Sequence, residues 1–171
     1  DNTATLPEEF LKTDRGCPPF CLQPMVAAEG VETVGELELL EFLKKSAEGD
    51  ASILVVDSRT PDWVMRGTIP GSVNIPWSQL RQDSMTGMFG DSDESQIDKI
   101  MEEQFGAKQG EKGWDFADAK TLVLFCNGIW CGQSSSNIAT LVEAGYPADK
   151  LKWYRGGMQD WVSAGLTTVK P

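Results

Sequence analysis

Short apolar runs recur along the chain and are separated by amphipathic stretches. The clearest is Ile-Leu-Val-Val at the start of residues 53–59, and similar runs occupy residues 121–125 and 152–154. Continuous short apolar runs of this kind are typical of strands that are buried on both faces, as in a parallel sheet. We therefore predict strands in these three segments, and a turn with a fourth short strand within residues 69–77.

The segment from residue 33 to residue 49 predicts a helix. Three leucines recur at helical spacing and would form its apolar face: Leu37, Leu40 and Leu43. Thr33 is the candidate N-cap, and Glu36, three residues later, would complete a capping box. Gly49 is expected to end the helix.

Four further helices are predicted, within residues 60–67, 92–107, 134–145 and 155–165. Thr60 and Pro61 suit the N-cap and first turn of the first of these. Gly145 would stop the third, and the last is expected to bury Trp161. The alternation of short apolar strands with helices predicts an α/β domain with a largely parallel sheet.

Two segments differ in character from this domain. Residues 1–32 lack clear periodicity, and their prolines forbid a helix around residues 18–24, so we expect an ordered extension that lies on the domain. The domain itself would occupy residues 33–171. Residues 83–118 are rich in acidic side chains and have too few apolar positions for a core of their own. We interpret them as an acidic insertion, either a solvated lid or a docking surface for a basic redox protein.

Composition narrows the function. The 171 residues suit one domain, and 15 basic against 26 acidic side chains give a net charge of -11. An acidic surface repels nucleic acid and anionic membranes, so neither is expected as a partner. The chain has no histidine, which removes the commonest general base and the commonest metal ligand. No window is long and apolar enough to span a bilayer, and we expect neither a metal nor another cofactor.

The cysteines fall in two pairs, and the first is Cys17 with Cys21. We expect this pair to be structural, either as a small disulfide or as two buried thiols. The sequence opens DNTATLPEEF, with no initiator Met and no signal-peptide pattern. With the even cysteine count, this favours a periplasmic or secreted protein whose signal peptide has been removed, with a cytoplasmic location as the alternative.

The second pair, Cys126 and Cys131, lies where a strand meets a helix. Ligands bind beyond the carboxyl ends of parallel strands, and the next helix, starting near Ser134, would direct its free N–H groups and dipole at the same loop. Gly128 and Gly132 let the backbone curl so that several N–H groups converge on one anion. This environment would lower the pKa of Cys126 and make it nucleophilic.

Cys131 leaves several interpretations open. It could form a disulfide with Cys126 that simply holds the loop, or it could resolve a persulfide or sulfenate on Cys126 by forming that disulfide. It could also be the nucleophile itself, because it lies nearer the start of the helix.

Three ordered segments of the chain resemble the rhodanese-like sulfurtransferase family: ILVVDSRTPDWVMRGTIPGSVNIP, LVLFCNGIWCGQSSSNIATLVEAGY and YRGGMQDWVSAGLTTV. The resemblance implies one rhodanese-like domain with a five-stranded sheet flanked by helices. It also implies that Cys126 accepts a sulfane sulfur from thiosulfate or a polysulfide and passes it to a thiol, cyanide or similar acceptor. Asp57 and Arg59 match the family's Asp-x-Arg, which implies a structural ion pair, with Arg59 also available to an anionic donor.

The active-site loop departs from the family pattern. It is longer than the usual C-x-x-G-x-R, Gln133 stands at the helix entry where that pattern has a basic residue, and no Lys or Arg lies between Cys126 and Lys150. The missing arginine argues against a phosphatase. The bulky loop side chains favour an apolar pocket for a polysulfide, a protein persulfide or a thiol. The expected substrate-binding residues are Asn127, Gly128, Ile129, Trp130, Gly132, Gln133, Ser134 and Arg59.

Two other functions fit the same residues. A thiol–disulfide redox protein would use Cys126 and Cys131 without any sulfane sulfur. A non-enzymatic binding module would bind a partner through the acidic insertion, with a stable Cys126–Cys131 disulfide that holds the loop.

Overall fold

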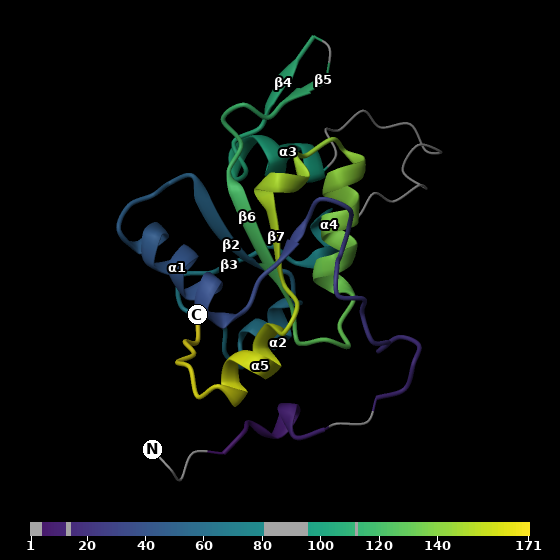
Figure 1. Cartoon of the computed structure of the whole chain (residues 1–171), viewed down its shortest axis with the longest axis vertical. Helices are drawn as coiled ribbons and strands as arrows, with labels where there is room; N and C mark the ends of the chain where they lie inside the picture. The colour runs from purple at the N-terminus through teal and green to yellow at the C-terminus, as the bar shows by residue number, and fades with distance from the viewer. Residues whose placement is uncertain (1–4, 13–14, 81–95, 112) are drawn as a thin grey trace.

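A computed structural model of the chain describes residues 5–12, 15–80, 96–111 and 113–171, and its centre is a five-stranded sheet (Figure 1). The strand order is β1-β7-β6-β2-β3, and every pairing in this sheet is parallel. The strands are β1 (Glu32–Thr33), β2 (Ile53–Asp57), β3 (Val73–Asn74), β6 (Thr121–Phe125) and β7 (Leu151–Tyr154). The predicted α/β architecture and its parallel sheet are confirmed, and the predicted strands all form.

The register of the sheet gathers three strand ends at one edge. Asp57 of β2 is level with Phe125 of β6, and Phe125 is level with Tyr154 of β7. Residues that follow these strands therefore emerge side by side. This places Cys126, directly after β6, between the segments that leave β2 and β7.

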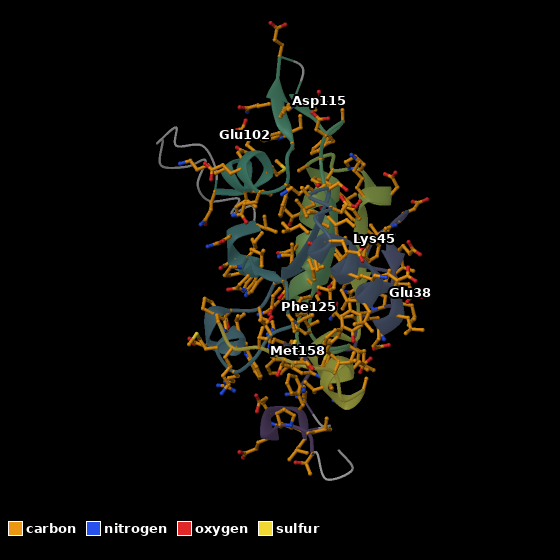
Figure 2. All side chains as sticks on the ribbon, turned by 90° about the vertical axis from the view of Figure 1, so that its left-hand side faces the viewer. Glu38, Lys45, Glu102, Asp115, Phe125 and Met158 are labelled. Carbon is orange, nitrogen blue, oxygen red and sulfur yellow. A yellow bond between two sulfur atoms is a disulfide. The ribbon has the colours of Figure 1, made fainter. Side chains whose placement is uncertain are left out.

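Helices cover both faces of the sheet: α1 (Glu36–Ala47), α2 (Pro61–Val64), α3 (Gln96–Glu103), α4 (Gln133–Glu143) and α5 (Gly157–Ser163). Successive side chains of a strand point to opposite faces, so the strands feed two core clusters. Val123 and Phe125 pack with α1 and α5, and Phe125 and Met158 of this cluster are labelled in Figure 2. Leu122 and Leu124 pack with α3 and α4 on the other face.

The first helix differs from the prediction at its start and on its buried face. Thr33 belongs to β1, so its assignment as N-cap was wrong; the helix begins at Glu36 after Gly35. Glu38 instead accepts a hydrogen bond from the Gly35 N–H at 3.0 Å. The predicted leucine face was wrong in part: Leu37 is 74% exposed, whereas Leu43 packs against the core and Leu39 is fully buried there. The error at the helix start follows from β1, because a two-residue strand has no periodicity to detect and its presence delays the helix.

The acidic segment is partly integrated into the domain. Its first part, 83–95, lies outside the described residues. Beyond it, α3 and Phe105 are buried in the core cluster on the α4 face. A small hairpin, β4 (Lys108–Gly110) with β5 (Gly113–Asp115), occupies a stretch predicted as loop. Helix α3 and this hairpin lie at the end of the molecule where β6 begins, opposite the loop that follows β6, so this part of the segment does not cover the cysteines (Figure 1).

Short 3-10 turns complete the described structure: η1 (Glu8–Phe10), η2 (Trp77–Leu80) and η4 (Ala148–Lys150). Within the described residues, no helix has the length and apolar character needed to cross a membrane.

Candidate active site

The sulfur of Cys126 is held by a chain of two hydrogen bonds. The side chain is 2% exposed, and its Sγ accepts a hydrogen bond from Ser134 Oγ, in the first turn of α4, at 3.3 Å. Ser134 Oγ in turn accepts a hydrogen bond from Trp153 Nε1 of β7 at 3.0 Å. A hydroxyl has one proton, and the indole N–H can only donate. The Trp153 contact therefore directs the Ser134 proton toward the sulfur.

This environment lowers the pKa of Cys126 to about 7. Burial alone raises the pKa, because it disfavours the charged thiolate. Hydrogen bonds from the Cys131 thiol, the Ser134 hydroxyl and the backbone N–H groups of Ser134 and Gly128 outweigh that effect. The protonated form has a competing interaction, since Cys126 Sγ donates to the Cys131 carbonyl oxygen at 3.2 Å. The balance leaves thiol and thiolate similarly populated at neutral pH.

Cys131 has the opposite character. Its pKa is raised because its thiol donates a hydrogen bond to Cys126, because it is buried, and because the negative charge of Cys126 disfavours a second thiolate. Both sulfurs are free thiols in this structure. Of the two candidate nucleophiles, the geometry therefore favours Cys126, with Cys131 as its proton-bearing neighbour.

A pocket of about 390 Å³ opens beside the two cysteines. Cys131 forms part of its wall, whereas the more deeply buried Cys126 does not line it. The pocket brings together four of the predicted substrate-binding residues and several aromatic rings: Asn127, Trp130, Gly132, Gln133, Phe20, Trp63 and Trp77. Cys131 therefore separates the pocket from Cys126, and aromatic rings form much of the pocket wall.

The loop backbone is fastened to the start of α5. The backbone N–H groups of Met158 and Gln159 donate to the carbonyl oxygens of Cys126 and Asn127, each at 3.0 Å. Gly157 makes this approach possible. Its φ is +57°, and an added Cβ would collide with the Cys126 carbonyl oxygen and lie 2.8 Å from the Gly128 nitrogen. Sequence reasoning did not single out Gly157, although the Gly-Gly pair in the C-terminal segment was a visible signal.

Asp57 and Arg59 form a buried ion pair beneath the loop. Both are at most 1% exposed, and Arg59 donates to the Asp57 carboxylate through its Nε at 2.9 Å and its Nη2 at 2.6 Å. The guanidinium also donates to the Gly67 carbonyl at 2.8 Å and to Asn127 Oδ1 at 3.4 Å. With these donors engaged, Arg59 braces the loop. The structure therefore favours the predicted structural role of Arg59 over its predicted role in substrate binding.

The N-terminal extension crosses the cysteine loop. Cys17 and Cys21 are joined by a disulfide, with their Cα atoms 4.7 Å apart. Two residues further on, the Gln23 N–H donates to the Ile129 carbonyl at 2.9 Å, and the Gln23 Oε1 accepts from Ser135 at 3.0 Å. The predicted loop residue Ile129 thus contacts the extension through its backbone.

Trp130 is the point where the extension and α5 meet the loop. Its indole Nε1 donates to Gln159 Oε1 at 2.7 Å. The Phe20 ring stands edge-on to it with a centroid distance of 5.6 Å. Phe20 and Gln159 had no distinguishing pattern in the sequence, because their importance comes only from this contact.

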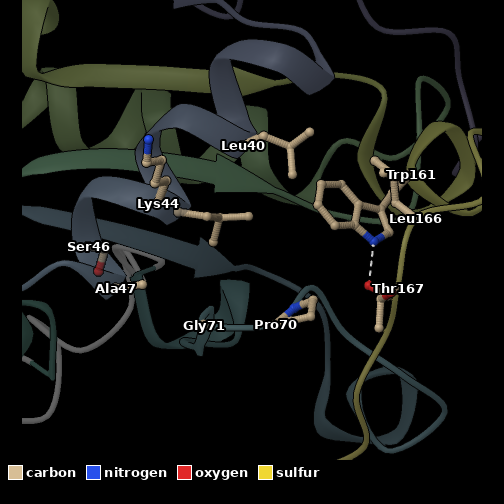
Figure 3. Close-up of a pocket in the computed structure, with 10 residues that line it drawn as sticks. Leu40, Lys44, Ser46, Ala47, Pro70, Gly71, Trp161, Leu166 and Thr167 are labelled. Atoms are coloured by element: carbon tan, nitrogen blue, oxygen red, sulfur yellow. Dashed lines mark hydrogen bonds between the residues drawn. The ribbon is translucent and has the colours of Figure 1, made fainter.

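A larger cavity of about 560 Å³ lies elsewhere, between α1, the turn before β3 and the C-terminal segment (Figure 3). Leu40, Leu43 and Trp161 dominate its wall, together with Lys44. No cysteine is among its lining residues. Nor do the described residues bring together a group of three or more metal-ligating side chains anywhere. The cysteine pocket is therefore the candidate active site.

The fold is that of an α/β domain with a cysteine-bearing loop between a buried parallel strand and a helix. Residues 39–164 match the Rhodanese-like domain family, and the chain belongs to that family. No curated protein matches the sequence.

Among solved structures, one similar protein comes from Rhodopseudomonas palustris CGA009 and is described as a possible tyrosine phosphatase. It is 22% identical, with 84% of this chain and 88% of that chain covered and a TM-score of 0.54. Another, from Bacillus halodurans, is 16% identical, with 81% of this chain and 77% of that chain covered and a TM-score of 0.53. A third, from Lactobacillus plantarum, is 16% identical, with 80% of this chain and 86% of that chain covered and a TM-score of 0.51. At these identities the likeness concerns the fold alone.

Proposed function

We propose that this protein is a sulfurtransferase that carries sulfane sulfur as a persulfide on Cys126. The observation that carries the proposal is the hydrogen-bond chain from Trp153 through Ser134 to the Cys126 sulfur. A thiolate is the nucleophilic form of cysteine, and a pKa of about 7 makes about half of Cys126 nucleophilic at neutral pH. Membership of the rhodanese-like family supports the same chemistry.

The reaction balances without an external oxidant or reductant. The Cys126 thiolate attacks the outer sulfur of the donor, a new S–S bond forms, and the donor's own S–S bond breaks. The leaving group takes the electron pair, as sulfite from thiosulfate or as a shortened polysulfide. An acceptor thiolate or cyanide then attacks the terminal persulfide sulfur and returns Cys126 as a thiolate. The backbone N–H groups of Gly128 and Ser134 stabilise the negative sulfur in each state.

Intact-mass spectrometry of the reduced protein tests this proposal. Brief exposure to polysulfide or thiosulfate should add one sulfur atom to the wild type and none to Cys126→Ala. Cyanide should remove the added sulfur and form thiocyanate. Lys44→Gln serves as a control and should still gain the sulfur, because Lys44 is exposed on α1 and lines the separate cavity away from the cysteines. A Cys126→Ala protein that transfers sulfur as well as the wild type would refute the proposal.

A second candidate function uses Cys131 as a resolving thiol. The observation in its favour is that Cys131 is a free, buried thiol beside Cys126, with a raised pKa that keeps it protonated. Its sulfur would attack the Cys126 sulfur of the persulfide, form a Cys126–Cys131 disulfide and release sulfide, which takes the Cys131 proton. A dithiol reductant would then have to reopen the disulfide.

Cys131→Ser separates the two candidates. In a sulfurtransferase, the variant should hold its persulfide at least as long as the wild type and still pass it to an added thiol. In the resolving mechanism, the wild type should release sulfide and lose two hydrogens, and Cys131→Ser should do neither.

A further inference from the structure

The cysteine loop has no cation of its own, and the N-terminal extension supplies one. No Lys or Arg lies between Cys126 and Lys150. Arg15 of the extension places its guanidinium carbon 3.5 Å from the centre of the Trp130 ring. A guanidinium stacked on an indole at this distance is held by a cation–π interaction and by dispersion. A residue more than a hundred positions away thus brings a positive charge to the loop.

Part of the hydrogen-bonding capacity of the Arg15 guanidinium is not used within the protein. Its Nη2 donates to the Glu9 carbonyl at 3.3 Å, while its Nε is buried and has no hydrogen-bond partner among the residues that the structure describes. A buried donor without a partner costs free energy that a ligand can recover.

Arg15 also lines open space that adjoins the cysteine pocket. It faces a pocket of about 320 Å³ together with Phe20 and Trp130, and these two rings line the Cys131 pocket as well. The other charged groups on this pocket are Lys12 and Asp160. A second adjoining pocket of about 390 Å³ is lined by Glu8, Glu9, Lys12, Arg15 and Arg66, with Trp63 shared with the Cys131 pocket. Bases outnumber acids by three to two around that second opening, in a chain whose net charge is strongly negative.

We propose that Arg15 is the residue that recognises the anionic end of the sulfur donor, so that the extension selects negatively charged sulfane donors for the Cys126 site. This inference rests on the proposed sulfurtransferase function and names its substrate class. The planar guanidinium suits the oxygens of a sulfonyl-type group, which it can bind through two parallel N–H donors. Arg15 lies outside the cysteine loop and provides the positive charge that the loop itself lacks.

The extension is built to hold Arg15 in place. The disulfide between Cys17 and Cys21 begins two residues after Arg15 and restricts the backbone there. Beyond it, Arg155 donates to the carbonyl oxygens of Gln23 at 2.8 Å and Pro24 at 2.9 Å, next to the contact between Gln23 and Ile129. The stacked guanidinium is therefore positioned before a donor arrives, which reduces the entropy lost on binding.

The test compares an anionic donor with a neutral one. Modification of Cys126 is followed with thiosulfate, which leaves a persulfide and releases sulfite, and with a neutral organic trisulfide, which leaves a mixed disulfide on Cys126 and releases an organic hydropersulfide. The proteins compared are wild type, Arg15→Gln, Arg15→Lys and the charge-matched control Lys44→Gln. Lys44 is 74% exposed on α1 and lines the separate apolar cavity. Arg15→Gln should raise the KM for thiosulfate about tenfold or more, since the charge-assisted contact with the anion is lost, and should leave the reaction with the trisulfide unchanged. Arg15→Lys should fall between wild type and Arg15→Gln, and Lys44→Gln should match wild type.

Calorimetry with the Cys126→Ala protein measures donor binding without the sulfur-transfer reaction. Thiosulfate should bind Cys126→Ala, and adding Arg15→Gln should weaken that binding about tenfold. Equal thiosulfate affinity with and without Arg15, or an equal loss of reaction with both donors, would overturn the inference. A wild type whose Cys126 is modified by neither donor refutes the proposed function instead, and the calorimetric comparison still decides whether Arg15 binds the anion.

Discussion

Ser134 donates a hydrogen bond to the Cys126 sulfur at 3.3 Å while its own oxygen accepts one from the Trp153 indole at 3.0 Å. Ser134 lies in α4, Trp153 in β7 and Cys126 directly after β6, so the sheet register and the packing of one helix fix the protonation chemistry of one thiol.

The alkylation rate of Cys126 should follow a titration with a midpoint near pH 7. The lowered pKa means that the reactive thiolate is already half populated there, and the rate should rise with pH and level off about one unit above it. An ordinary thiol would reach its midpoint at about 8.5. Iodoacetamide labelling with peptide mapping measures the profile, and Cys131, whose pKa is raised, should stay unlabelled through this range. A midpoint at or above 8.5 would contradict the site geometry.

Replacing Ser134 with alanine should shift that midpoint to higher pH. The variant removes the hydroxyl donor, while burial continues to raise the pKa against fewer hydrogen bonds, so we expect a higher midpoint and a slower reaction at pH 7. Ser135→Ala is the matched control, because Ser135 donates to Gln23 and Gly132 and not to the sulfur. Equal shifts in the two variants would show that the Ser134 hydroxyl is not the cause.

Gly157→Ala should destabilise the protein and displace the cysteine loop. The left-handed backbone disfavours any side chain, and the new Cβ would also collide with the Cys126 carbonyl oxygen. Gly165→Ala isolates the first effect, since Gly165 has a φ of +73° and no atom within 4 Å of an added Cβ. Urea unfolding should give a loss of about 1 kcal/mol for Gly165→Ala and clearly more for Gly157→Ala. A similar loss in both would mean that the loop accommodates the methyl group.

Arg59→Leu should cost about 3–5 kcal/mol of folding stability, because it leaves the Asp57 carboxylate buried without its partner. Lys44→Ala is the comparison: its ion pair with Glu48 is exposed and 3.9 Å long, so its loss should cost at most about 1 kcal/mol. Thermal and urea unfolding measure both. If Arg59→Leu keeps wild-type stability but raises the KM for thiosulfate, Arg59 binds substrate after all.

The architecture was largely predictable from local patterns. The apolar runs at β2, β6 and β7 and the helices α2, α4 and α5 form where their residues predicted them, because strand and helix signals lie within a few neighbouring positions. The elements that the prediction missed are also short, local ones. Strand β1 has two residues and the β4–β5 hairpin has three on each strand, too short to show a period, and β1 displaced the start of α1.

The sequence by itself determined that a cysteine follows a buried strand, that a helix starts a few residues later, and that the chain belongs with the rhodanese-like domains. The tertiary structure decided which partners that cysteine has. Trp153 reaches Ser134, Gly157 admits the loop backbone, and Arg15 stacks on Trp130 across a separation of more than a hundred residues. Periodicity and capping act between near neighbours in the chain, whereas a pKa depends on every group packed within a few ångströms, and only folding brings those groups together.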